Sequence, residues 1–123
     1  MKIRIEDNSV RFRLRKSEVA QLAASGSLCA RTVFAEGTFE YCLLSSPSNT
    51  DLTASFDKGR IVIRIPAAWA REWPESPQVG FERILSQEGG SSLHLLVEKD
   101  FVCLDRDPET QKDQFPNPKQ GKI

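Results

Sequence analysis

The residues best suited to chemistry in this sequence are its only histidine, His94, and the cysteine that follows it, Cys103. A cysteine nucleophile needs a base within hydrogen-bonding reach, and His94 is the one classical candidate. A zinc site would need two further ligands, such as Asp105 and Asp107, but the spacing of the four residues fits no standard zinc motif. We therefore expect no catalytic residue and no cofactor, with Cys103, His94, Asp105 and Asp107 as the candidates for metal or thiol chemistry.

A second candidate site is basic. The first sixteen residues, MKIRIEDNSVRFRLRK, carry six basic and two acidic side chains, a net charge of +4 in a chain whose formal charge is zero. If the alternating apolar residues face a core, the basic residues between them share the opposite face of a hairpin. A two-stranded ribbon of this kind fits the major groove, where guanidinium groups contact phosphates. With related positions later in the chain, the candidate nucleic-acid-binding residues are Lys2, Arg4, Arg11, Arg13, Arg15, Arg60 and Arg64.

The alternative is that the basic face is paired within the protein. The segment from Glu98 to Asp113 holds six acids and three bases, a net charge of −3, and follows the last predicted strand. Single exposed pairs contribute only about 0–1 kcal/mol, so this contact would be a loose latch that a polyanion can displace. We expect the acidic segment to neutralise part of the basic face in the folded monomer.

Composition narrows the class of protein. The chain has 123 residues, is 39% hydrophobic and 28% charged, and balances 17 basic against 17 acidic residues, which is ordinary for one soluble domain. No apolar run is long enough to cross a membrane. The three cysteines are odd in number and include no C-x-x-C pair, so we expect no disulfide framework and a cytoplasmic location.

Alternation of apolar and polar residues indicates that strands dominate. Four hairpins are predicted, with turns at Asp7-Asn8, at Glu36-Gly37, at Lys58-Gly59 and across residues 86–91. The loop at residues 45–51 separates the first two hairpins from the second two.

Two short helices are predicted between these hairpins. Ser17 is the expected N-cap of the first helix, and Gly26 is expected to stop it. Pro66 is placed at the first position of the second helix, and Pro74 ends it. The two tryptophans of the second helix lie four residues apart on one face, and we expect them in the core.

The chain contains an internal duplication. Ile3 and Ile5 match Ala54 and Phe56 at an offset of 51 residues. A unit of about 45 residues rarely buries enough apolar area to fold alone, so the two halves must share one core. The predicted fold class is mainly β with two short helices (α+β), in duplicated strand-strand-helix-strand-strand units that form one pseudo-two-fold barrel or sandwich. This arrangement would resemble a homodimer fused into one chain.

We divide the chain into a single duplicated domain, residues 1–104, and a polar C-terminal tail, residues 105–123. The first repeat spans about residues 1–46 and the second about residues 52–100. In the tail, Phe115 is expected to anchor on the domain itself. The expected state is a monomer (a pseudo-dimer) or a weak homodimer.

The stretch GRIVIRIPAAWAREWPESPQVGFERI, residues 59–84, resembles the swapped-hairpin DNA-binding domain of the AbrB and MazE class. In that class a strand leads through a proline into a short helix, and an alternating strand follows. The resemblance implies DNA contact by arginines on the hairpins. This chain departs from the class because ESPQ replaces the usual G-D turn and both copies lie in one chain.

The chain as a whole also resembles a group of small uncharacterised bacterial proteins, which share the segments MKIRI, NS, RFRL, EKDFVCL and FPNP. That resemblance implies no activity. The sequence therefore predicts a non-enzymatic cytoplasmic binding module that contacts nucleic acid or another protein through its basic hairpin face. The alternative is a small metal- or ligand-binding protein, or an enzyme, centred on Cys103 and the acidic C-terminal segment.

Overall fold

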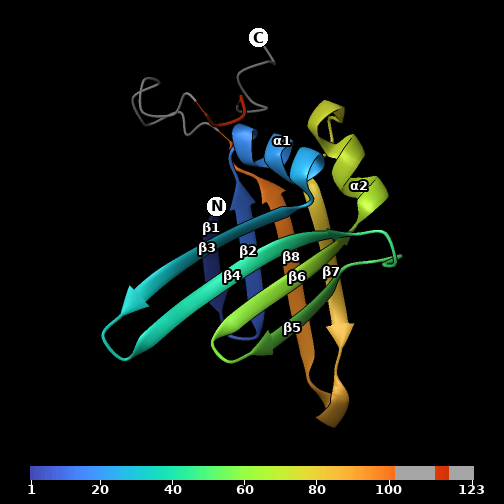
Figure 1. Ribbon diagram of the computed structural model, residues 1–123. Coiled ribbons are helices and arrows are strands. Elements are labelled where there is room, and N and C mark those ends of the chain that lie inside the picture. The colour runs from blue at the N-terminus through green and yellow to red at the C-terminus, as the bar shows by residue number, and fades with distance from the viewer. Residues whose placement is uncertain (102–112, 117–123) are drawn as a thin grey trace.

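The computed structural model describes residues 1–101 and 113–116. Within these residues, strands alternate with two α-helices and two short 3-10 helices (Figure 1). In chain order the elements are β1 (Lys2–Glu6), β2 (Ser9–Leu14), α1 (Lys16–Ser25), β3 (Ser27–Phe34), β4 (Gly37–Ser46), β5 (Thr53–Asp57), β6 (Arg60–Pro66), α2 (Ala67–Glu72), η1 (Trp73–Glu75), β7 (Gly80–Ser86), η2 (Glu88–Gly90) and β8 (Ser92–Lys99).

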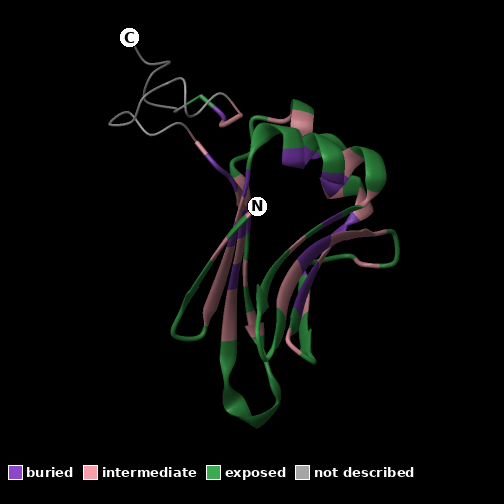
Figure 2. Cartoon of the chain, turned by 60° about the vertical axis from the view of Figure 1, so that its left-hand side comes forward, coloured by how far each residue is buried: buried purple, intermediate pink, exposed green. Residues whose placement is uncertain are grey.

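The strands form two four-stranded sheets, ordered β1-β2-β8-β7 and β3-β4-β6-β5. Each sheet takes one hairpin from each half of the chain, joined by a parallel pair: β2 with β8 in the first sheet, and β4 with β6 in the second. The sheets face each other, and the two α-helices lie side by side across one end (Figures 1 and 2). The fold class is thus confirmed as a duplicated α+β sandwich. It is not a closed barrel, because β1, β7, β3 and β5 remain sheet edges among the described residues. Neither α-helix in this part of the chain is long and apolar enough to cross a membrane.

The two halves use the same hairpin register. Ile3 lies opposite Phe12 in the β1–β2 hairpin, and the residues 51 positions later, Ala54 and Ile63, lie opposite each other in the β5–β6 hairpin. The turns also agree, since Asp7 and Lys58 have φ values of 47° and 49°. This left-handed conformation is the one that two-residue hairpin turns require.

The core lies between the sheets and beneath the helices (Figure 2). Trp73 is 1% exposed, and its indole Nε1 donates a hydrogen bond of 2.9 Å to the carbonyl oxygen of Gln78. Trp69 is partly buried and stacks on Phe81, with the ring centroids 5.1 Å apart. The two tryptophans are therefore structural, as predicted. The other large, fully buried side chains include Phe12, Leu14, Leu22, Ile63, Ile65 and Leu95.

Helix α1 begins earlier than the sequence indicated. Arg15 is its N-cap, and the backbone N–H of Arg15 donates to the Glu18 carboxylate at 2.8 Å. Ser17 therefore lies inside the first turn, and its hydroxyl donates to Asp113 instead of capping the helix. Gly26 ends the helix as predicted, with a φ of 81° that favours glycine.

Two other boundaries differ by one residue. Pro66 is the last residue of β6, so α2 starts at Ala67. The turn between β3 and β4 lies at residues 35–36, one position before the expected Glu36-Gly37 turn.

A disulfide joins Cys29 and Cys42, which corrects the expectation of no disulfide framework. The two residues lie directly opposite each other in the β3–β4 register, with their Cα atoms 4.1 Å apart. This spacing is close to that of a non-hydrogen-bonded antiparallel pair, where side chains approach most closely. The pairing follows from strand register, so a search for C-x-x-C spacing does not detect it.

The described part of the tail, residues 113–116, docks on the domain. Phe115 is 8% exposed, and its backbone N–H donates to the Asp100 carbonyl oxygen at 2.9 Å. Its ring packs near Phe101 and lies 4.9 Å from the Lys99 ammonium. Phe115 is thus the predicted intramolecular anchor. Most of the predicted tail lies outside the described residues.

Candidate functional site

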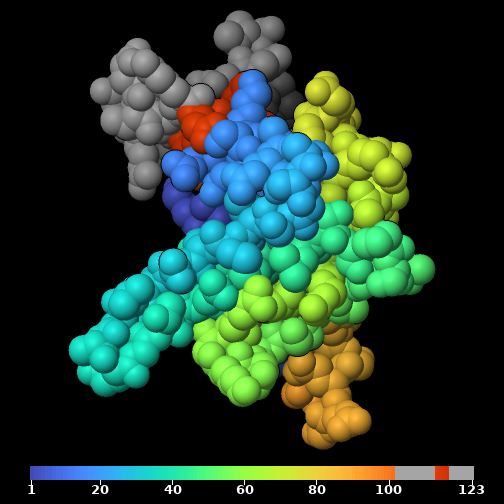
Figure 3. All heavy atoms as spheres, viewed as in Figure 1, coloured from blue at the N-terminus to red at the C-terminus, as the bar shows by residue number. Residues whose placement is uncertain are grey.

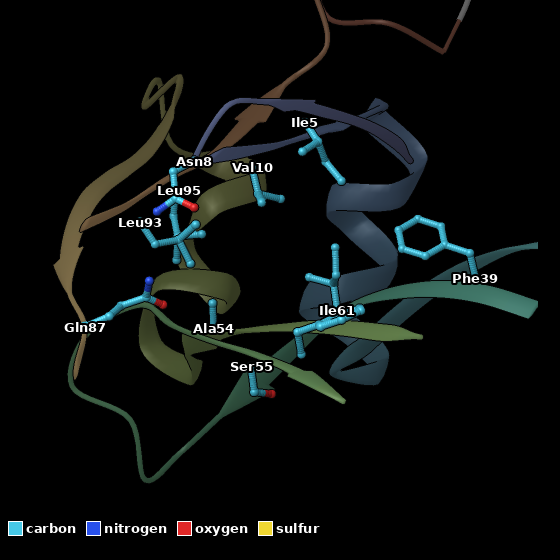
Figure 4. Close-up of a pocket in the computed structure, with 11 residues that line it drawn as sticks. Ile5, Asn8, Val10, Phe39, Ala54, Ser55, Ile61, Gln87, Leu93 and Leu95 are labelled. Carbon is cyan, nitrogen blue, oxygen red and sulfur yellow. The ribbon is translucent and has the colours of Figure 1, made fainter. Parts of the chain in front are cut away.

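An apolar cavity of about 380 Å³ lies between the two sheets. Its lining includes Asn8 of the β1–β2 turn, and this turn lies at the end of the sandwich away from the helices (Figure 1). Figure 4 shows side chains from both sheets turned toward this space. Its apolar lining includes Ile5, Val10, Phe39, Phe56, Ile61 and Leu95.

The cavity lies where equivalent strands of the two halves face each other. Ile5 and Phe56 are equivalent residues of the two duplicated hairpins, and so are Val10 and Ile61. All four line the cavity. The inward-facing residues at the tips of both hairpins therefore create the space.

One difference between the halves enlarges it. Ala54 lines the cavity, whereas the equivalent residue of the first half is the larger Ile3, which packs against the core. Sequence reasoning matched these two residues but did not interpret the loss of side-chain volume. That difference is the sequence signal for the cavity.

The mouth of the cavity exposes apolar surface. Ile5 is 55% exposed and Phe56 is 69% exposed. Clustered exposed apolar residues of this kind mark interaction sites more often than isolated ones do.

The polar side chains that line the cavity are the amides of Asn8 and Gln87 and the hydroxyl of Ser55. The Asn8 side-chain amide donates to the Ser92 carbonyl oxygen, and the Gln87 amide donates to the Ser91 hydroxyl at 3.0 Å. The nitrogen atom of each amide donates in these bonds, so the oxygen atom of each amide is left as an acceptor. The described residues that line the cavity include no charged side chain. The geometry suits binding of a neutral ligand rather than acid–base or nucleophilic catalysis.

The predicted nucleic-acid-binding residues lie elsewhere, and the structure does not bring all of them together. Four of them lie on β1 and β2, on the outer face of the first sheet: Lys2, Arg4, Arg11 and Arg13. Arg15 caps α1, while Arg60 and Arg64 lie on β6 in the other sheet.

Acidic neighbours pair with the basic residues of the hairpin. Arg11 and Arg13 both donate to one carboxylate oxygen of Glu98 on β8, at 2.6 and 2.8 Å. Lys2 pairs with Asp100 at 3.0 Å. These contacts arise because β8 lies directly beside β2 and places Glu98 opposite Arg13. Further pairs join Arg4 to Glu6, Arg15 to Glu18 and Arg60 to Glu40.

The predicted neutralisation of the basic face holds for Glu98 and Asp100, but these two acids contact it from β8 and from the residue directly after that strand, not as a latch that crosses the sheet. Asp113, at the end of the acidic segment, lies 3.9 Å from Arg15 and accepts hydrogen bonds from the backbone and hydroxyl of Ser17. It therefore holds the start of α1 rather than the hairpin. Asp105, Asp107 and Glu109 lie outside the described residues.

Hydrogen bonding keeps the acidic partners ionised. Burial acts to raise the pKa of Asp100, but hydrogen bonds from Gln114 and Lys2 overcome it and lower the pKa below its ordinary value. The hydrogen bond from the Ser17 side chain lowers the pKa of Asp113, against a smaller effect of burial. Both carboxylates are therefore charged partners at neutral pH.

The metal candidates do not form a site in the described residues. His94 lies on the outer face of the first sheet, with its Nε2 2.5 Å from a carboxylate oxygen of Glu82. Within residues 1–101 and 113–116, no three histidine, cysteine or acidic side chains are placed to share a metal ion. Cys103, Asp105 and Asp107 lie outside these residues.

Comparison with known proteins gives one match. No curated protein and no solved structure matches the chain, so the resemblance to the AbrB and MazE class is not confirmed. The resemblance to an uncharacterised family is confirmed, because one family model matches residues 1–119. The chain belongs to this family of unknown function, DUF7009.

Proposed function

We propose that this protein is a non-enzymatic binding module that holds an uncharged, apolar small molecule in the cavity between its sheets. The observation that carries the proposal is a space of about 380 Å³ lined by apolar side chains of both halves. Small-molecule sites commonly have volumes of about 300–1,000 Å³, a mostly apolar lining and a few polar groups that fix orientation.

The lining defines the chemistry of the ligand. A charged group would lose its hydration in this cavity without gaining an ionic partner from the lining, at a cost of several kcal/mol. The oxygen atoms of Asn8 and Gln87 can accept hydrogen bonds, so a hydroxyl or amide N–H at one end of the ligand would complete them. The ligand class is thus a neutral molecule with an apolar body and at most a small polar end.

The exposed mouth supports a binding role over a purely structural one. If the residues at the mouth served folding alone, burial of Phe56 would stabilise the sandwich, since apolar surface removed from water contributes roughly 25 cal/mol per Å². Here that ring is 69% exposed beside an open space. A ligand in the cavity would cover it.

A cytoplasmic location is part of the proposal, on the odd number of cysteines and the lack of a C-x-x-C pair, although a Cys29–Cys42 bond is more typical of an oxidising compartment. In the cytoplasm the Cys29–Cys42 disulfide meets reducing thiols.

The test is titration of the protein with the uncharged dye Nile red, whose fluorescence rises in apolar surroundings. Ala54→Phe fills the cavity, and its matched control is Thr53→Phe on the same strand, where the side chain is exposed on the opposite face. We expect the wild type and the control to bind equally and Ala54→Phe to bind at least about tenfold more weakly. The proposal would be refuted if Nile red did not bind the wild type, or if Ala54→Phe bound it as tightly as the wild type does.

Nucleic-acid binding through the basic hairpin face is the second candidate. It rests on the exposure of Arg4, whose side chain is 65% exposed, and on the weakness of partly exposed ion pairs. A polyanion would have to displace Glu98 from Arg11 and Arg13. Glu98→Gln should therefore strengthen binding to heparin at low salt, and high salt should abolish that gain. Equal and negligible heparin binding by both forms would remove this candidate and leave the cavity proposal unaffected.

A further inference from the structure

The disulfide lies on the outer face of the second sheet, away from the cavity. Its two cysteines belong to the β3–β4 hairpin, which projects from the body of the molecule (Figure 3). Strand β3 is an edge of the sheet, so a second molecule can approach Cys29 from the side of the edge. The equivalent positions of the second half are Glu82 and Leu96, which lie opposite each other without a disulfide. The bond is therefore a feature of one half rather than of the duplicated fold.

The two sulfur atoms have different surroundings. Cys29 is exposed, whereas Cys42 is 0% exposed. Arg60 lies beside Cys42, and a guanidinium N–H donates to its sulfur at 3.4 Å. Glu40 holds Arg60 in this position through a contact of 2.7 Å. Cys29 is thus the cysteine on the solvent side of the bond, and the sulfur of Cys42 lies beside a fixed positive charge.

We propose that Cys29–Cys42 is a site of thiol–disulfide exchange with a dithiol reductant. A thiolate of the reductant attacks the sulfur of Cys29 and forms a mixed disulfide, while the bond between the two protein sulfurs breaks. Cys42 leaves as a thiolate, and Arg60 stabilises its negative charge. The second thiol of the reductant then attacks the reductant sulfur that is bonded to Cys29. The reductant becomes a disulfide, and Cys29 is released.

The reaction balances without a further reactant. The protein disulfide accepts two electrons and two protons and becomes two thiols, and the dithiol loses the same and becomes a disulfide. The reverse reaction, with an oxidised partner of the same class, restores the bond. Because the cysteines face each other in the hairpin register, the strands keep them in position for reoxidation.

The first experiment identifies the attacked sulfur. A Cys103→Ser variant retains only the two cysteines of the site. After air oxidation, its denatured form should show almost no reaction with Ellman's reagent, and two thiols should appear after treatment with dithiothreitol. Brief exposure of the folded protein to reduced glutathione, acid quenching and peptide mapping should then place the glutathione on Cys29. Two free thiols after oxidation, or glutathione on Cys42, would overturn the proposal.

The second experiment tests the role of Arg60 in the same background. We expect Arg60→Gln to slow reduction by dithiothreitol at pH 7 by about threefold or more, because the departing Cys42 thiolate loses its positive neighbour. Arg60→Lys should retain most of the rate, which separates the effect of charge from damage to the fold. The matched control is Arg64→Gln, on the same strand and the same face. Equal rates for Arg60→Gln and Arg64→Gln would overturn the assignment of Arg60.

Discussion

Replacement of Ala54 by isoleucine should stabilise the protein, which is an unusual result for a change in a sandwich interior. The substitution gives the second half the residue that the first half has at the equivalent position, Ile3. Isoleucine adds three carbon atoms that project into the cavity. Complete burial contributes about 0.8 kcal/mol for each CH₂ group. Ala54 is only partly buried, so we expect roughly 1 kcal/mol rather than the full value.

The assay is urea unfolding followed by tryptophan fluorescence, which the buried Trp73 makes sensitive to loss of the core. Thr53→Ile is the control, because it adds β-branched side-chain volume on the exposed face of the same strand. Ala54→Ile should raise the free energy of unfolding relative to this control, with an unchanged m value, and should weaken Nile red binding. Destabilisation by 1 kcal/mol or more, which is typical of overpacking, would refute the reasoning that open space lies beside Ala54.

Two further predictions concern stability. Trp73→Ala should lower the free energy of unfolding by about 3–5 kcal/mol, because it removes a ring that is 1% exposed and leaves a large void; a loss below 1 kcal/mol in urea unfolding would contradict this packing role. Stability should also fall in acid, because the folded-state pKa values of Asp100 and Asp113 lie below the ordinary value of 3.8. The unfolded chain therefore binds more protons than the folded chain in acid. The contribution of both carboxylates to stability is complete above their unfolded-state pKa and is lost as the pH falls through their folded-state pKa values. The double variant Asp100→Asn, Asp113→Asn should show a shallower loss of stability in circular dichroism as the pH falls from about 5 to about 2, and an identical pH profile would contradict the assignment.

The fold was predictable because its signals are local and repeated. Alternating apolar residues located the strands, and the turns Asp7-Asn8 and Lys58-Gly59 fixed two hairpin registers correctly. The match at an offset of 51 residues then indicated a shared core. The combination of one hairpin from each half in each sheet was not predictable, because the parallel pairing of β2 with β8 joins residues that are far apart in the sequence.

The disulfide shows how one residue of error in a turn changes the pairing of strands. With the turn at residues 35–36, Cys29 lies opposite Cys42. A turn at Glu36-Gly37 shifts the register by two residues and places Cys29 opposite Leu44. The number and spacing of the cysteines had argued against a disulfide, and the register implied by the predicted turn would not have revealed the bond either. The ion pairs of the hairpin were also predicted with the wrong geometry. Glu98 was assigned to a latch, although it contacts Arg13 from the neighbouring strand.

The differences between the halves locate the chemistry more sharply than their common features do. Strand register makes Glu98 on β8 equivalent to Leu44 on β4, so the ionic cluster occurs on one sheet only. The Cys29–Cys42 bond occurs only on the other sheet. A duplicated fold needs equivalent residues at core positions, where both copies perform the same packing. Positions that have diverged are free of that requirement. The loss of volume at Ala54, beside a cavity that both halves build, is therefore the asymmetry most directly connected with binding.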